Sequence, residues 1–310
     1  MVTKEGIVRD ILRLIVWYPL RWTTQMLPVA AGIRLLNKMG EVHFALLKGK
    51  TETLRENLSR FMDIDDAKKT EIIRDYLKNH YVDRLIIFIF PKFHTRQIEQ
   101  TLDFEGLENL DAALAKGKGV ILVHGHFGPV HIPLVALARL GYRMKQIGLP
   151  SDEGLSWIGR RVAFRLRLRY EAKIPAEIVN AESFLRPIFL WLRAGGIVMA
   201  TGDGSGTEKH VGRHEVFDFL GHKVLFPLGP AILAEKTGAE ILPLFITPGQ
   251  RKPYKIIIGA PLAPLSGPRH SIHTVTERFI RELEGKIRAH PACMHFLDRF
   301  KEGQYAVKPD

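Results

Sequence analysis

Apolar residues follow two patterns along this chain, and each pattern predicts a different kind of secondary structure. Apolar positions spaced by three and four residues predict helices, of which 273–289 has the clearest stripe. Short apolar or alternating runs between the helices predict strands at 119–124, 142–147, 197–200, 240–247 and 254–259. Strands that alternate with helices are typical of an α/β domain, so we expect a mixed, largely parallel sheet flanked by helices.

The region before the first predicted strand follows the helical pattern. Residues 53–62 and 66–88 have apolar positions at helical spacing. The run LIIFIF at 85–90 is too short to cross a bilayer, so it is either buried core or part of a lipid-facing groove. We therefore divide the chain into an N-terminal segment, 1–40, an α/β domain, 41–303, and a tail, 304–310.

The N-terminal segment mixes apolar, aromatic and charged residues. In 7–20, IVRDILRLIVWYPL, the apolar residues surround two arginines and an aspartate, and the apolar piece 26–36 is broken by Arg34. Neither piece reaches the roughly 20 uninterrupted apolar residues that a spanning helix needs. The pattern favours an interfacial membrane anchor with aromatic side chains at headgroup depth. The alternative is an ordinary amphipathic helix packed on the domain.

The stretch KGVILVHGHFGPVHIPLVALARL, 118–140, carries the most chemistry. An apolar strand runs into a turn at 125–128, and a helix is expected from Pro129 onward. Open α/β sheets place their active sites in such loops, at the carboxyl ends of strands. Three histidines lie within this stretch: His124, His126 and His131.

These histidines have three interpretations. Each imidazole can be structural, with its hydrogen bonds satisfied inside the core. A zinc site is disfavoured, because Cys293 is the one cysteine and no Asp or Glu follows at ligand spacing. The third interpretation is a general base, which needs an exposed imidazole at a turn and a second group that fixes its tautomer.

Several blocks of sequence form a recognisable set. The first is His126-Phe127-Gly128 followed by His131, with DFEGLENL at 103–110 and AKGKGV at 115–120 before it. The others are VFDFLG at 216–221, FPLGPA at 226–231, AEKTGA at 234–239, and His290-Pro291 with DRFK at 298–301. As a set these blocks resemble the bacterial lipid A (lauroyl/myristoyl) acyltransferase family, within the lysophospholipid and glycerolipid acyltransferases. The resemblance covers most of the chain, and the fold it implies is the same α/β sheet.

The resemblance implies that His126 takes the proton of an acceptor hydroxyl. The family signature is a histidine, four residues, and then an aspartate or glutamate that holds the histidine ring. Here His131 stands at the place of that acid. The departure is important, because loss of an equivalent orienting acid in serine proteases costs on the order of ten-thousandfold in rate.

Three alternatives follow from the missing acid. The dipole of the expected helix keeps His131 neutral, so that it can accept a hydrogen bond from His126 and form a His–His pair. A carboxylate from elsewhere in the chain, such as Asp203, can replace the acid. In the third alternative the protein is a weakened or inactive member of the family, a lipid-binding protein on the same fold.

The turn residues themselves are candidates for contact with substrate. We expect backbone N–H groups at the Gly128 turn to stabilise an oxyanion. The glycine-rich turn TGDGSG at 201–206 can cradle a phosphate or an oxyanion through its backbone, with Asp203 and Gly204 in contact with substrate. By resemblance, Asp203 corresponds to an aspartate of the family.

Five arginines crowd into WIGRRVAFRLRLR, 157–169. A guanidinium group binds phosphate through paired hydrogen bonds. The resemblance implies that this region lies near the acceptor side, so we expect a phosphorylated glycolipid or phospholipid headgroup here. An ordinary solvated face is the alternative. The candidate headgroup-binding residues are Arg160, Arg161, Arg165 and Arg169.

The formal net charge of +12 restricts the class of partner. A basic chain favours nucleic acid, an anionic membrane surface or an acidic carrier protein. Nucleic acid is disfavoured because the chain has no RNA- or DNA-binding motif. A single cysteine excludes a disulfide framework and fits the reducing, cytosolic side of a membrane.

The residues and the resemblance together predict a membrane-associated O-acyltransferase at the cytoplasmic face of the inner membrane. It would move a fatty acyl chain from a thioester, on acyl carrier protein (ACP) or coenzyme A (CoA), to a hydroxyl of a lipid A precursor, glycolipid or lysophospholipid. The thioester is a co-substrate, so we expect no resident cofactor and no metal.

Overall fold

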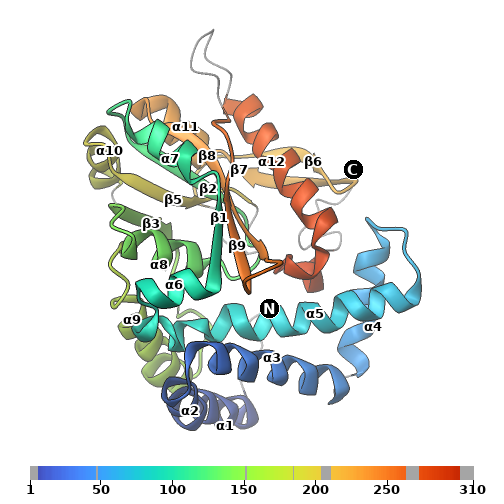
Figure 1. Cartoon of the computed structure of the whole chain (residues 1–310). Coiled ribbons are helices and arrows are strands. Elements are labelled where there is room, and N and C mark those ends of the chain that lie inside the picture. Colours follow the sequence, from blue (N-terminus) through green and yellow to red (C-terminus); the bar gives the residue numbers. More distant parts are fainter. Residues whose placement is uncertain are drawn as a thin grey trace.

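A seven-stranded sheet forms the centre of the computed structural model (Figure 1), which describes residues 6–46, 48–150, 152–183, 185–203, 211–262 and 272–300. The strand order is β1-β9-β8-β2-β5-β3-β4. Neighbouring strands are parallel except for β8 and β9, which are antiparallel. The predicted mixed, largely parallel sheet flanked by helices is therefore confirmed.

The strands of this sheet are short. They are β1 (Leu102–Glu105), β2 (Val120–His124), β3 (Met144–Gly148), β4 (Glu177–Asn180), β5 (Ile197–Thr201), β8 (Glu240–Pro248) and β9 (Tyr254–Ile258). A separate antiparallel hairpin is made by β6 (His214–Phe219) and β7 (His222–Pro227). Every residue of β2 is buried, because helices cover both faces of the sheet, and this explains its uninterrupted apolar sequence.

Helices form the remaining layers. In chain order they are α1 (Ile7–Ile15), α2 (Arg21–Met26), α3 (Val29–Leu46), α4 (Lys48–Ser59), α5 (Asp66–Leu85), α6 (Thr95–Thr101), α7 (Leu107–Leu114), α8 (His131–Arg139), α9 (Arg165–Glu171), α10 (Arg186–Arg193), α11 (Gly229–Thr237) and α12 (Ile272–Ala289). Two π-helical turns, Val16–Leu20 and Gly159–Phe164, lead into α2 and α9. The tail predicted at 304–310 lies outside the described residues.

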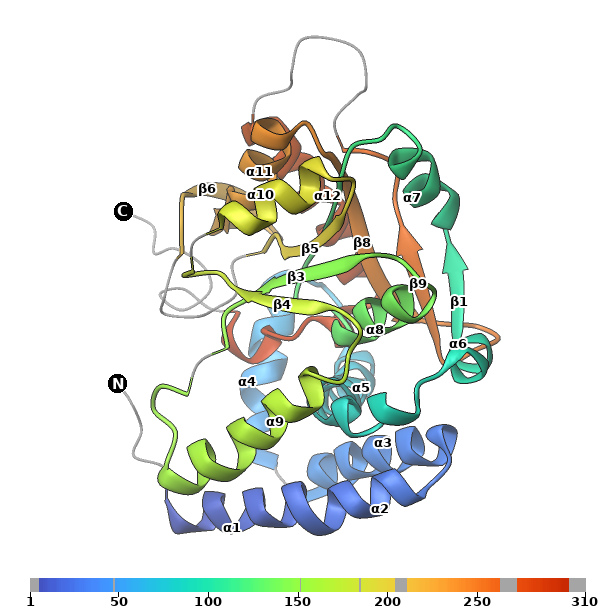
Figure 2. The same cartoon turned by 90° about the vertical axis from the view of Figure 1, so that its left-hand side faces the viewer.

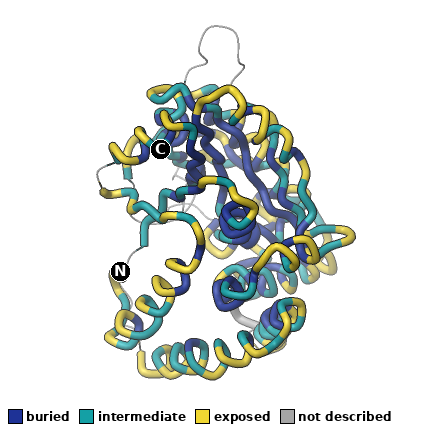
Figure 3. Tube along the Cα trace, turned by 60° about the vertical axis from the view of Figure 1, so that its left-hand side comes forward, coloured by how far each residue is buried: buried dark blue, intermediate teal, exposed yellow. Residues whose placement is uncertain are grey.

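Two hydrophobic clusters cover the two faces of the sheet, and the central strands are dark blue in the burial view of Figure 3. Ile121 and Val123 of β2 face the cluster that includes α11 and α12, whereas Val120 and Leu122 face the cluster that includes α8. The run 85–90 is buried throughout, so the buried-core interpretation of that run is confirmed.

The N-terminal helices form an outer layer, in which α1 lies beside the helical segment that contains α9 (Figure 2). The guanidinium of Arg13 donates to Ser156 Oγ at 3.2 Å, which ties α1 to the start of that segment, and to Asp10 within α1 at 3.0 Å. No residue of α1 is buried. Within the described ranges, no helix combines the length and apolar character needed to span a bilayer.

Candidate active site

The register of β2 against β5 brings two distant turns together. These parallel strands are neighbours in the sheet, and His124 at the end of β2 pairs with Thr201 at the end of β5. The Gly202 N–H donates to the His124 carbonyl at 2.8 Å, which extends the pairing into the turns. Two residues beyond the paired strand ends come His126 and Asp203, and the register therefore places these two side chains side by side.

Two hydrogen bonds join His126 to Asp203. The imidazole Nδ1 lies 2.7 Å from Oδ1 of Asp203, and the backbone N–H of His126 donates to Oδ2 at 2.7 Å. A carboxylate oxygen only accepts, so the ring proton is on Nδ1 and Nε2 is the basic nitrogen. The imidazole is 26% exposed and the carboxylate 5% exposed. His126 is therefore held in one tautomer by a buried acid while its ring remains accessible.

Charge reinforces this geometry. Burial by itself lowers the pKa of His126, but the negative charge of Asp203 and its hydrogen bond raise it, and the pKa lies above its ordinary value. Burial raises the pKa of Asp203, whereas His126 lowers it through charge and hydrogen bonding, and this pKa lies below its ordinary value. Both directions favour an imidazolium–carboxylate pair when His126 accepts a proton.

Two glycines allow the turns to approach each other. A Cβ atom on Gly202 would lie 2.4 Å from a methyl group of Val123. A Cβ atom on Gly125 would lie 2.8 Å from the side chain of Leu283 and 3.3 Å from Oδ2 of Asp203. Any larger residue at either position would push the turns apart, so the close packing of His126 and Asp203 depends on these glycines.

Comparison with known proteins identifies the family of this chain. The family model described as bacterial lipid A biosynthesis acyltransferase matches residues 7–302. The chain belongs to this acyltransferase family. Two relatives are the phosphatidylinositol mannoside acyltransferases of Mycobacterium tuberculosis strains CDC 1551 / Oshkosh and ATCC 25618 / H37Rv. Each is 26% identical to this chain over 261 residues, which cover 80% of this chain and 76% of the relative.

In this acyltransferase the helix that the sequence predicts from Pro129 begins at His131, as α8, and His131 does not hold His126. Among the described residues no hydrogen bond joins the two rings; Asp83, Arg167 and Glu171 are the electrostatic neighbours of His131. Burial lowers the pKa of His131. The expectation that His131 orients His126 is therefore corrected. The geometry is that of the second alternative, in which a carboxylate from elsewhere in the chain holds the ring.

Substitution of His131 tests whether His131 or Asp203 holds the ring of His126. Because Asp203 already fixes the ring, we expect His131→Gln to keep acyl transfer within about tenfold of wild type, below the range for loss of an acid–base group. His131→Glu should give no gain, because the acid that it restores is already supplied. Initial rates with a fixed thioester and lipid acceptor measure both effects. A loss of more than about a hundredfold in the rate of His131→Gln would show that His131 orients the ring of His126.

The Gly128 turn also differs from expectation. Gly128 has φ of +65°, its N–H donates to the Cys293 carbonyl at 2.8 Å, and its own carbonyl lies 2.6 Å from Nε2 of His295. The N–H is therefore already satisfied within the fold, which corrects the prediction that it contacts an oxyanion. Gly204, the other predicted substrate-binding glycine, lies outside the described residues.

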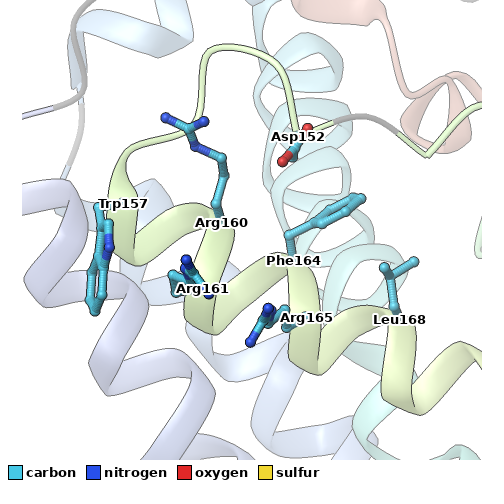
Figure 4. Close-up of a pocket in the computed structure, with 7 residues that line it drawn as sticks. All are labelled: Asp152, Trp157, Arg160, Arg161, Phe164, Arg165 and Leu168. Atoms are coloured by element: carbon cyan, nitrogen blue, oxygen red, sulfur yellow. The ribbon is translucent and has the colours of Figure 1, made fainter.

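The arginine-rich segment adopts a helix, and one face of it lines a pocket of about 530 Å³ (Figure 4). The lining residues are Asp152, Trp157, Arg160, Arg161, Phe164, Arg165 and Leu168. Arg169, the fourth predicted headgroup-binding arginine, lies on α9 but is not part of the lining. Further along the same helix, the charges of Arg167 and Glu171 act on His131 at the start of α8.

Two residues that the sequence does not predict at this site, His295 and Phe296, pack against the ring of His126. The ring of Phe296 lies 4.9 Å from the ring of His126, measured between centroids, and the ring of His295 lies 6.2 Å away. Both residues come from the C-terminal end of the described chain. Their one signal in the sequence is the block around His290-Pro291, which belongs to the family resemblance but does not indicate what it contacts.

Proposed function

We propose that this acyltransferase moves a fatty acyl chain from the thioester of ACP or CoA to a hydroxyl group of a phosphorylated membrane glycolipid, such as a lipid A precursor, at the cytoplasmic face of the inner membrane. The observation that carries the proposal is the accessible His126 imidazole held by buried Asp203. An accessible imidazole with a fixed tautomer and a carboxylate partner is suited to remove a proton from a hydroxyl group.

The transfer can be written with this pair alone. Nε2 of His126 accepts the proton of the acceptor hydroxyl while the hydroxyl oxygen attacks the thioester carbonyl. The new C–O bond forms, the C–S bond breaks, and the departing thiolate takes the proton back from the imidazolium. Asp203 stabilises the imidazolium between these two proton transfers, because its negative charge favours the protonated ring.

A phosphate-bearing acceptor fits the arginine pocket. Three of its lining residues are arginines, and Trp157, Phe164 and Leu168 supply apolar surface beside them. Such a pocket matches an amphiphile with an anionic headgroup. The two relatives are named for a phosphatidylinositol mannoside, which is also a phosphorylated glycolipid. We therefore assign the pocket to the acceptor headgroup.

A membrane surface fits the N-terminal helices. Ile7, Val8, Ile11, Leu12 and Ile15 share one face of α1, and each has an exposed fraction of 49% or more. Trp22 and Met26 of α2 are also exposed, at 53% and 85%. Because α1 is tied to the arginine-rich segment through Arg13 and Ser156, binding of α1 to a bilayer would bring the pocket to the lipid headgroups.

Binding to vesicles tests the pocket. Each basic residue near an anionic bilayer contributes about 1 kcal/mol, so Arg161→Ala with Arg165→Ala should weaken binding by about 2 kcal/mol, or roughly thirtyfold. Cosedimentation with vesicles that contain phosphatidylglycerol measures the change, and the loss should diminish at high salt. The matched control replaces Arg96 of α6 and Arg251 of the β8–β9 connection, both exposed, by alanine. Equal binding by the two double variants would refute the assignment.

The alternative of an inactive lipid-binding protein rests on the missing acid at position 131. Because Asp203 contacts His126, the missing acid at position 131 is no longer an argument for an inactive protein. A direct test of the proposal follows the release of thiol from acyl-CoA and from acyl-ACP, with and without vesicles of mixed membrane lipids. We expect release to require the vesicles, and release from acyl-ACP to fall with added salt if the carrier is the donor. Release that is independent of the acceptor would exclude lipid acylation as the activity.

A further inference from the structure

The C-terminal segment 293–295 runs alongside the catalytic turn 126–128. Phe127 and Met294 form an antiparallel bridge. The Gly128 N–H donates to the Cys293 carbonyl at 2.8 Å, and the His295 N–H donates to the His126 carbonyl at 3.0 Å. The backbone on both sides of His126 is therefore held by a segment far away in sequence.

The side chain of His295 adds a further bond to the same turn. Its Nε2 lies 2.6 Å from the Gly128 carbonyl oxygen, which only accepts, so Nε2 carries the proton. Its Nδ1 lies 3.6 Å from Oδ2 of Asp83, and both side chains are 17% exposed. Burial lowers the pKa of His295, which favours the neutral ring with its single proton on Nε2.

Helices α4 and α5 also fix the C-terminal segment, through hydrogen bonds to its backbone carbonyl groups. Asn79 donates to the Ala292 carbonyl at 2.9 Å, and the Tyr76 hydroxyl donates to the His295 carbonyl at 3.1 Å. Asn57 donates to the Leu297 carbonyl at 2.7 Å. The segment is thus anchored on both sides of His295, and this gives the imidazole a rigid support from which to hold the Gly128 carbonyl.

We propose that His295 is a positioning residue for acyl transfer. Asp203 fixes the His126 ring from one side, and His295 fixes the turn that carries this ring from the other. The inference rests on the proposed function for its catalytic consequence, but the contact itself can be tested without substrate. A displacement of about 1 Å at a catalytic group can cost on the order of a hundredfold in rate, so the hydrogen bond to Gly128 bears on kcat.

Two amide variants separate the contacts of the ring. The amide nitrogen of glutamine reaches the place of Nε2, so His295→Gln keeps the bond to Gly128. The amide nitrogen of asparagine reaches the place of Nδ1. His295→Asn therefore loses the bond to Gly128 and keeps only a nitrogen atom that faces Asp83. We expect His295→Asn to lower kcat by up to about a hundredfold with little change in KM, and His295→Gln to stay within a few fold of wild type.

The control is His94→Asn, in an exposed position next to α6, and it should match wild type. Equal kcat in His295→Asn and His295→Gln, or a loss in His295→Gln alone, would overturn the proposal. Nitrogen-15 NMR of the imidazoles provides the readout that is independent of acyl transfer. The Nδ1 proton signal of His126 should stay sharp in wild type and His295→Gln and broaden in His295→Asn.

An unchanged His126 signal in folded His295→Asn would overturn the positioning role even if the enzyme is active. Absence of acyl transfer by wild type, together with the expected NMR pattern, would reject the proposed function and leave the contact established. The two failures are therefore distinguishable.

Discussion

Asp203→Asn is expected to lower kcat for acyl transfer by on the order of ten-thousandfold, the loss observed for the orienting acid of serine proteases. His126 presents two donors to Asp203, its backbone N–H and its Nδ1–H. A carboxylate accepts both, whereas an amide has one oxygen and directs its NH₂ group at the second donor. The ring then turns away or moves its proton to Nε2 in most molecules, and only the small remaining fraction, in which Nε2 is still the base, carries the residual rate.

The pH profile of the same variant distinguishes a catalytic effect from a merely structural one. Asp203 raises the pKa of His126, so its removal leaves burial, which lowers that pKa. The base form exists above the pKa of His126, so activity is lost as pH falls through it, and in Asp203→Asn this acid limb should move to lower pH. The measurement is kcat/KM between about pH 5 and pH 9.

The matched control for this prediction is Asp218→Asn, at an exposed position of the β6–β7 hairpin, where Asp218 pairs with Lys223. It should match wild type in both rate and pH profile. If Asp203→Asn retained a rate within about tenfold of wild type, Asp203 would not be the group that holds the base.

His126→Ala is expected to lower transfer by about a thousandfold or more, within the range for loss of a general base. The alanine backbone N–H can still donate to Asp203, so the substrate pockets should persist and the loss should fall on kcat. Added imidazole should restore part of the rate, because it can occupy the space of the missing ring. His94→Ala is the matched control; an active His126→Ala would remove this histidine from the mechanism.

The same variant should also be less stable. Asp203 is 5% exposed and loses its ring partner, and an unsatisfied buried polar group costs about 1–3 kcal/mol. Thermal unfolding would show this as a lower Tm, and it would establish that the variant is folded at the temperature of the assay.

The sequence predicts the elements around His126 better than it predicts what they contact. The strand 119–124 and the helix after Pro129 are found as β2 and α8, because buried strands and amphipathic helices have strong patterns. The partner of His126 could not be derived in this way. Strands β2 and β5 are neighbours in the sheet but are separated in the chain by β3 and β4, and the strand order is a property of the whole fold.

Short edge elements were also difficult to predict. β4 has four residues at the edge of the sheet, with a burial pattern that is half exposed, so it lacks a clear apolar pattern. The apolar positions of residues 180–193 predict one helix, but α10 begins only at Arg186, and Pro187 occupies its first turn. Proline is favoured at a helix start and excluded from its interior, and the position of Pro187 could have marked this boundary.

The arginine-rich segment shows a different limit. Its apolar residues partly alternate, as in a strand, while its arginines recur at helical spacing, so the pattern supports two structures. The structure has a π-helical turn that continues into α9, which places Arg161, Arg165 and Leu168 along the same pocket. Packing against α1 and α2 favours the helix, since Arg21 of α2 donates to Tyr170 of α9 at 3.0 Å.

The central claim is that this chain esterifies a membrane lipid through His126. The most direct test is mass spectrometry of vesicle lipids after incubation with an isotope-labelled acyl thioester, with wild type and His126→Ala side by side. Wild type should yield a lipid that is heavier by one labelled, ester-linked acyl chain, and His126→Ala should not. Label found only in free fatty acid, or the same acylated lipid in both incubations, would contradict the claim.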